Sequence, residues 1–123
     1  MLVNLTPHPM HIFGFDCPDQ IEPGTVEPIR VIESSGDLAR VAGDEIGQWD
    51  ADDLLVIRVD YRGVVGLPPY AGHMDSRDRE VWYLVSLPVA LAARDRADLL
   101  VPYAHVRNMT GSVIGCRMFA QPS

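Results

Sequence analysis

The chain has 123 residues, 47% of them hydrophobic, which is enough for one packed core and too apolar for a disordered segment. Its formal net charge of −7 argues against non-specific nucleic-acid binding, because nucleic-acid phosphates would be repelled. Ten glycines and ten prolines indicate many turns, which favours short strands over long helices. We therefore expect a single domain over residues 1–123.

Short apolar runs, separated by turn residues, predict a series of strands. In chain order these are residues 2–5, 10–15, 28–32, 38–41, 46–49, 54–61, 81–85, 98–103 and 113–119. Pro7 and Pro9 end the first run, because each lacks a backbone donor and has a fixed φ. Residues 16–28, with three prolines, and the polar residues 70–80 are expected to be loops.

Two turns and one helix complete the expected fold. Arg62-Gly63 predicts a turn after the strongest strand, and residues 108–112 predict the turn of a C-terminal hairpin. The helix is expected at residues 89–96, with Ser86 as N-cap and Pro88 in its first turn. These elements predict a mainly β (α+β) protein, either a small curled sheet or a partly open barrel with one short helix.

The arrangement of strands leads to two further expectations. The first strand should pair with, or lie beside, the strand around 99–102 or 113–117, because its backbone groups need partners. Small sheets also leave edges that must be covered. We therefore expect a homodimer or a higher homo-oligomer.

The two cysteines, Cys17 and Cys116, are too few for a disulfide framework, so we expect free thiols and a cytoplasmic location. Neither a signal peptide nor an apolar run of membrane-spanning length is visible, so no membrane partner is expected. His8, His11 and Cys17 are zinc-type ligands, but their spacing around two prolines does not place them on one face of an element. We expect neither a metal nor another cofactor.

The C-terminal quarter contains the strongest candidates for anion binding. All ten basic residues are arginines, and no Asp or Glu follows Asp98. Arg107 and Arg117 therefore form a cationic region on an acidic protein, and a guanidinium can hold a phosphate through two parallel hydrogen bonds. A surface arginine paired with an acid such as Asp98 is the structural alternative. Cys116 in a strand is more typical of a small buried side chain than of a nucleophile.

Several blocks of sequence resemble one family. They are Asn-Leu-Thr-Pro-His at 4–8, Gly-Leu-Pro at 66–68, Val-Ser at 85–86, Asp-Leu-Leu-Val-Pro at 98–102, Val-Arg at 106–107 and Val-Ile-Gly-Cys-Arg at 113–117. The chain resembles a family of short, mostly uncharacterised proteins of phages, prophages and actinobacteria. That origin implies the cytoplasm of the host cell. By analogy of size and origin it suggests a sponge that sequesters a host immune signal of the cyclic dinucleotide or cyclic ADP-ribose type.

We therefore favour non-enzymatic binding of a small anionic, nucleotide-like ligand. The candidate contacts are Asn4, His8, Tyr61, Arg107, Asn108 and Arg117, with the arginines on phosphate and Tyr61 stacking on a base. The first alternative is a small enzyme that uses His8 as general acid/base with Arg107. The second is a phage structural or protein-interaction module without a small-molecule site.

Overall fold

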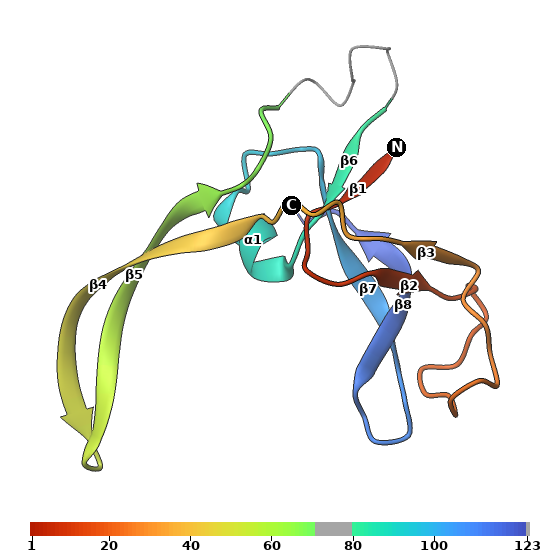
Figure 1. Ribbon diagram of the computed structural model, residues 1–123, viewed down its shortest axis with the longest axis horizontal. Helices are drawn as coiled ribbons and strands as arrows, with labels where there is room; N and C mark the ends of the chain where they lie inside the picture. The colour runs from red at the N-terminus through yellow and green to blue at the C-terminus, as the bar shows by residue number, and fades with distance from the viewer. Residues whose placement is uncertain (71–79, 123) are drawn as a thin grey trace.

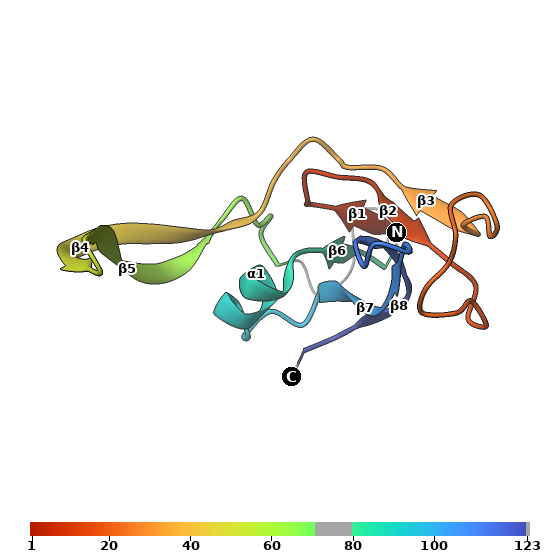
Figure 2. The same ribbon diagram turned by 90° about the horizontal axis from the view of Figure 1, so that it is seen from below.

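The computed structural model describes residues 1–70 and 80–122 and shows a mainly β protein with one short helix (Figures 1 and 2). Six strands form one nearly closed, barrel-like sheet, and the two longest strands form a separate hairpin. The barrel strands are β1 (Leu2–Asn4), β2 (Met10–Ile12), β3 (Arg30–Ile32), β6 (Trp82–Leu84), β7 (Leu99–Arg107) and β8 (Val113–Ala120). The expected fold class is thus confirmed. No helix in the described part of the chain is long and apolar enough to cross a membrane.

The barrel strands follow the order β1-β6-β7-β8-β2-β3. β1 and β6 pair in parallel, as do β6 and β7, whereas β7 and β8 form the antiparallel C-terminal hairpin that the sequence predicts. β2 pairs with β8 in parallel and with β3 antiparallel. A bridge between Asn4 and Ser34 then links the end of β1 to the chain that follows β3. This contact brings the two edges of the sheet together.

The expected position of the first strand is wrong. β1 pairs with β6, which separates it from β7 and β8. The reason is that β6 takes an inner position, where Leu84 and the following Val85 are fully buried, so β1 is left at the outer side of β6. The N-terminal strand that contacts the C-terminal hairpin is β2, through Ile12 opposite Cys116.

The buried residues form three clusters around the sheet. The first joins Ile12, Ile32, Leu84 and Cys116. The second packs the helix α1 (Leu87–Ala92) against the sheet through Leu5, Val85, Val89, Ala90, Ala93, Leu99 and Val101. The third lies under the loop of residues 14–28 and contains Phe13, Cys17, Ile21 and Val106. The loop expected at residues 16–28 is therefore anchored by its own apolar side chains.

The helix is shorter than expected. Pro88 lies in its first turn as predicted, but the Ser86 side chain makes no capping hydrogen bond. The helix ends at Ala92, and the chain then turns. After this turn the Arg96 guanidinium donates two hydrogen bonds to the buried Asp98 carboxylate, with Nε–Oδ1 and Nη2–Oδ2 distances of 2.9 and 2.8 Å. This hydrogen bonding to Asp98 raises the pKa of Arg96. The guanidinium also lies 5.6 Å from the centre of the Tyr70 ring.

The remaining strands, β4 (Arg40–Ala51) and β5 (Leu54–Val65), form a long hairpin that we call the arm. The sequence predicts two short strands where β4 runs without a break, and a turn at Arg62-Gly63 where β5 continues. Both expectations are wrong. The chain reverses at Asp52-Asp53, whose φ values of 53° and 62° are those of a tight hairpin turn. Gly63, with a φ of 69°, instead lies beside an irregularity in the ladder.

Candidate functional site

The Asn4–His8 block forms a loop that is organised around the Asn4 side chain. Asn4 is 1% exposed, and its Oδ1 accepts hydrogen bonds from the Thr6 amide at 3.0 Å and the Thr6 hydroxyl at 2.6 Å. Its Nδ2 donates to the carbonyl oxygens of His8 at 2.9 Å and Ile32 at 3.0 Å. Two donors and two acceptor positions are the full capacity of an amide side chain. Asn4 therefore closes the barrel and has no group left for a ligand.

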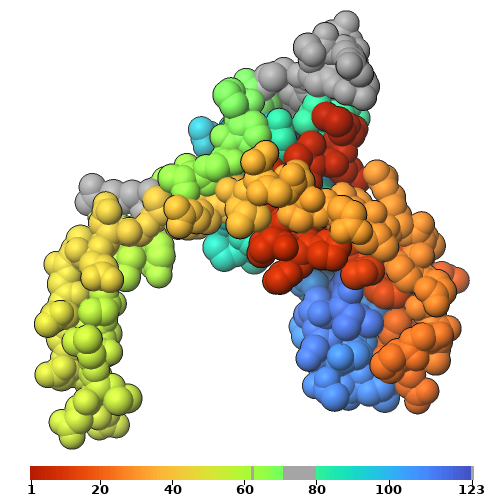
Figure 3. Space-filling model, in the orientation of Figure 1, coloured from red at the N-terminus to blue at the C-terminus, as the bar shows by residue number. Residues whose placement is uncertain are grey.

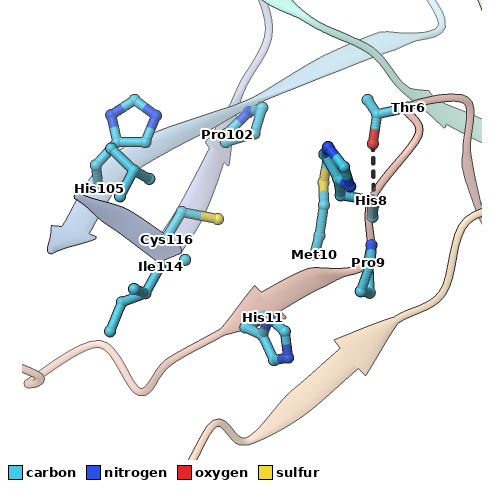
Figure 4. Close-up of a pocket in the computed structure, with 11 residues that line it drawn as sticks. Thr6, His8, Pro9, Met10, His11, Pro102, His105, Ile114 and Cys116 are labelled. Atoms are coloured by element: carbon cyan, nitrogen blue, oxygen red, sulfur yellow. Dashed lines mark hydrogen bonds between the residues drawn. The ribbon is translucent and has the colours of Figure 1, made fainter. Parts of the chain in front are cut away.

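The same loop places His8 at the rim of a cavity of about 310 Å³, which we call the His8 pocket (Figure 4). Its lining residues come from the loop and from β2, β7 and β8: Thr6, His8, Pro9, Met10, His11, Pro102, His105, Val113, Ile114, Gly115 and Cys116. The Cys116 sulfur points into the space between His105 and Met10, whereas the His11 ring points away from these groups. The cavity thus has two imidazoles at its rim and mainly apolar walls.

The His8 pocket differs in charge from the rest of the protein. Its described lining contains three histidines and no Asp or Glu, although the chain as a whole has a net charge of −7. Burial raises the pKa of the Cys116 thiol, and backbone hydrogen bonds with Tyr103 and Met118 oppose this rise only in part. The thiol is therefore protonated at neutral pH, and a protonated thiol is a poor nucleophile.

Metal binding has no support in this region. Within residues 1–70 and 80–122, no three His, Cys, Asp or Glu side chains are grouped so that they could hold a metal ion. Cys17, which is near His8 and His11 in sequence, packs instead with Phe13, Ile21 and Val106 under the 14–28 loop. Cys17 and Cys116 are both free and buried.

Arg107 lies beside the pocket, at the end of β7. Its exposed guanidinium donates one hydrogen bond, from Nη1 to the Gly111 carbonyl oxygen at 2.9 Å. Its partner across the β7–β8 ladder is Val113, which lines the pocket. Arg107 is therefore the ladder partner of a pocket residue, although it is not itself one of the lining residues. Asn108, the next residue, has a structural contact: its Oδ1 accepts hydrogen bonds from the turn that follows.

Arg117 is not the unpaired cation that its sequence neighbourhood suggests. Its Nη2 lies 2.6 Å from Asp19 Oδ1, and its Nη1 donates to the Cys17 carbonyl oxygen at 2.7 Å. Asp19 reaches it because the 14–28 loop folds back onto the hairpin, where the Arg107 amide donates to the Asp19 carbonyl oxygen. Arg117 thus fastens the loop to β8, and the expected cationic region is partly neutralised.

Tyr61 is not brought to the pocket. It lies on β5 of the arm and is 69% exposed, opposite Gly43 in the ladder. Figure 1 shows the arm well away from the β7–β8 hairpin. The six predicted site residues therefore do not form one site, and His8 and Arg107 are the two that remain close to a cavity and carry exposed polar groups.

The sequence interpretation missed Met10 and Pro102 as pocket residues. Pro102 carried a signal, because proline within a strand marks an edge or a bulge. Ala104, two residues later, has a φ of 55°, but the β7–β8 register continues from Val101 to Val106 and shifts only after Val106.

Comparisons of the chain with protein-family models, with curated proteins and with solved structures found no match. What the pocket can hold is therefore inferred from its own residues. These are two imidazoles at the rim and sulfur and proline side chains below them, with Arg107 as the ladder partner of the lining residue Val113.

Proposed function

We propose that the protein binds a small anionic, nucleotide-like ligand in the His8 pocket and does not convert it chemically. The observation that carries this proposal is a cavity without carboxylates in its described lining, on a chain of net charge −7. Its volume of about 310 Å³ lies at the lower end of the range of small-molecule sites, roughly 300–1,000 Å³. Such a cavity fits one ring system, with the rest of the ligand outside it.

The walls suit a planar ring. Pro9, Met10 and Pro102 offer apolar surface, and thioethers make favourable contacts with aromatic rings. The imidazoles of His8 and His105 stand at the rim, where their N–H groups can donate to polar atoms on the edge of a base. The ring would then lie over Met10, with its polar edge toward the histidines.

Arg107 would hold the charged part of the ligand. A guanidinium has five N–H donors, and the structure uses one of them for Gly111. A phosphate that extends past Val113 can therefore form a two-pronged contact with the remaining donors. Arg117 would support this indirectly, by fixing the loop beside the hairpin.

Binding without turnover is sufficient for a protein that sequesters a signal, which is the role suggested by the resemblance to phage and prophage proteins. The protonated Cys116 thiol argues against a cysteine enzyme. The second candidate function is acid/base catalysis by His8 with Arg107, favoured by their positions around one cavity. Product analysis after incubation with ligand distinguishes the two.

The first experiment is Arg107→Ala, tested by calorimetry with a cyclic dinucleotide and with a cyclic ADP-ribose isomer. A phosphate contact of about 1.5–3 kcal/mol predicts an affinity loss of roughly 10-fold or more, with little change in melting temperature. Arg58→Ala on the arm is the matched control and should bind normally. Mass spectrometry of the denatured protein should also reveal co-purified nucleotide. Unchanged affinity in Arg107→Ala would contradict the proposed contact, and released hydrolysis product would favour the enzyme.

A further inference from the structure

The arm is the largest feature that ligand binding does not explain. In Figure 3 it stands apart from the barrel, with open space between it and the β7–β8 hairpin. No described side chain between residues 40 and 65 is buried. Seven large apolar side chains of the arm are between 36% and 69% exposed: Ile46, Trp49, Leu54, Leu55, Ile57, Tyr61 and Val65. Large exposed apolar side chains gathered on one element are typical of an interaction site.

The ladder register divides these residues between two faces. Trp49 lies opposite Val56, and Ala51 opposite Leu54, so these four residues form what we call the Trp49 face. The alternate positions Leu55, Ile57, Val59 and Tyr61 lie on the other face. Because both faces carry apolar residues, neither is an ordinary solvent face. A two-stranded ribbon is at best marginally stable in water without a covering partner.

Charge indicates which surface covers the arm. Residues 43–60 contain six acids and one arginine, a net charge of −5 (1 − 6) out of −7 for the whole chain. Two arms packed together would therefore bring like charges into contact. Residues 99–123 contain two arginines and no acid. Arg117 is paired with Asp19, which leaves Arg107 as the exposed cation of this segment. The surface around the C-terminal hairpin, where residues 99–123 include no acid, therefore repels the acidic arm less than a second arm does.

That surface contains a second hollow, which we call the Tyr103 groove. It has a volume of about 530 Å³ and is lined by Ser86, Leu87, Val101, Pro102, Tyr103, His105, Ala120 and Pro122. Two of its largest apolar side chains are themselves exposed, Leu87 at 51% and Tyr103 at 59%. The groove is wide enough for an aromatic side chain and shares Pro102 and His105 with the His8 pocket.

We propose that the Trp49 face of the arm in one copy occupies the Tyr103 groove of a second copy, and that the exchange is reciprocal. A strand of 12 residues spans roughly 40 Å, which is long enough to reach across a neighbouring barrel of this size. The Trp49 face presents two large exposed apolar side chains, Trp49 at 57% and Leu54 at 68%. Reciprocal exchange makes this contact twice, so both copies cover their exposed Trp49 and Leu54 side chains. The exchange gives a two-fold symmetric dimer.

The test uses two variants, Trp49→Asp in the arm and Tyr103→Asp in the groove. Wild type should sediment as a dimer at micromolar concentration, and each variant alone should be a monomer. An equimolar mixture should form a heterodimer, because the intact arm of Tyr103→Asp can enter the intact groove of Trp49→Asp. That mixed dimer should be weaker than wild type by about 10-fold or more, since one of its two contacts is lost. Phe15→Ser, which changes an apolar residue that is 84% exposed but lies outside arm and groove, is the control and should remain dimeric.

Two results would overturn the proposal. A wild-type protein that stays monomeric up to about 100 µM shows that the arm has another partner or none. The second result is a Tyr103→Asp variant that still dimerises and forms no heterodimer when mixed with Trp49→Asp. This result would show that the arms contact each other instead.

Discussion

Asn4 is the residue on which the closure of the barrel depends most directly. Replacing it with alanine leaves the Ile32 carbonyl oxygen and the Thr6 amide without their side-chain partner, whereas the His8 carbonyl oxygen keeps the Thr6 hydroxyl. Each buried polar group left unsatisfied costs about 1–3 kcal/mol. We therefore expect Asn4→Ala to lower the free energy of unfolding by roughly 2–4 kcal/mol, measured by urea denaturation.

Asn108 provides a matched control for this prediction. Its Oδ1 also accepts hydrogen bonds from a backbone amide and a threonine hydroxyl two residues later. The turn it organises is largely exposed, so water can replace those bonds. Asn108→Ala should therefore cost less than about 1 kcal/mol. Equal losses for the two variants would show that Asn4 is no more important to stability than an ordinary turn residue.

The site residues show why residue-scale prediction from sequence succeeds only in part. The sequence indicated the Asn4–His8 block and the C-terminal hairpin as candidate regions, and both contribute residues to the His8 pocket. It could not show that all hydrogen-bonding groups of the Asn4 side chain are already used within the protein. Nor could it show that Arg117 pairs with Asp19, nearly 100 positions away in the sequence. Neighbouring charges in sequence reveal nothing about such long-range pairs.

At the scale of elements, the turn of the arm should limit its stability. Asp52 and Asp53 both have positive φ, a conformation that glycine adopts without cost. Asp53→Gly should slow amide exchange along β4 and β5 roughly 2- to 5-fold, because it relieves this strain and removes one of several nearby negative charges. Asp52→Pro should have the opposite effect, since proline cannot adopt a φ of 53°. Exchange in the barrel should not change in either variant.

The sequence predicted best those elements in which the alternation of apolar and polar residues and the turn residues indicate the same strand ends. The C-terminal hairpin and its polar turn at 108–112 were predicted; β8 lies within one residue of its predicted bounds, whereas β7 runs four residues past its predicted end at 103. The arm was not, because Asp-Asp is a weak signal for a tight turn whereas Arg62-Gly63 is a strong one. The register irregularities of β4 also interrupt the alternation of apolar and polar residues along it. The sequence therefore predicts two short strands in place of one long strand.

At the scale of the whole molecule, the described core and the arm are separate in composition as well as in space. The three buried clusters draw no buried member from residues 33–70, while residues 43–60 carry most of the net negative charge. Val41 and Val64, at the base of the arm, pack against the helix cluster. The barrel with its pocket is therefore one unit, and the arm is an extension whose contacts lie beyond its own chain in the proposed dimer.

This separation predicts that the barrel folds without the arm. Replacing residues 43–61 with Asn-Gly keeps Val41 and Val64 on the helix and removes no buried side chain from the described core. The melting temperature of the shortened monomer should stay within a few degrees of the wild-type monomer, represented by Trp49→Asp, because no buried apolar area is lost. The shortened protein should be monomeric by light scattering yet bind nucleotide with unchanged affinity. A large drop in melting temperature would show that the arm is part of the fold. Loss of nucleotide binding in a protein that still melts cooperatively would instead place the ligand site at the dimer contact rather than in the His8 pocket.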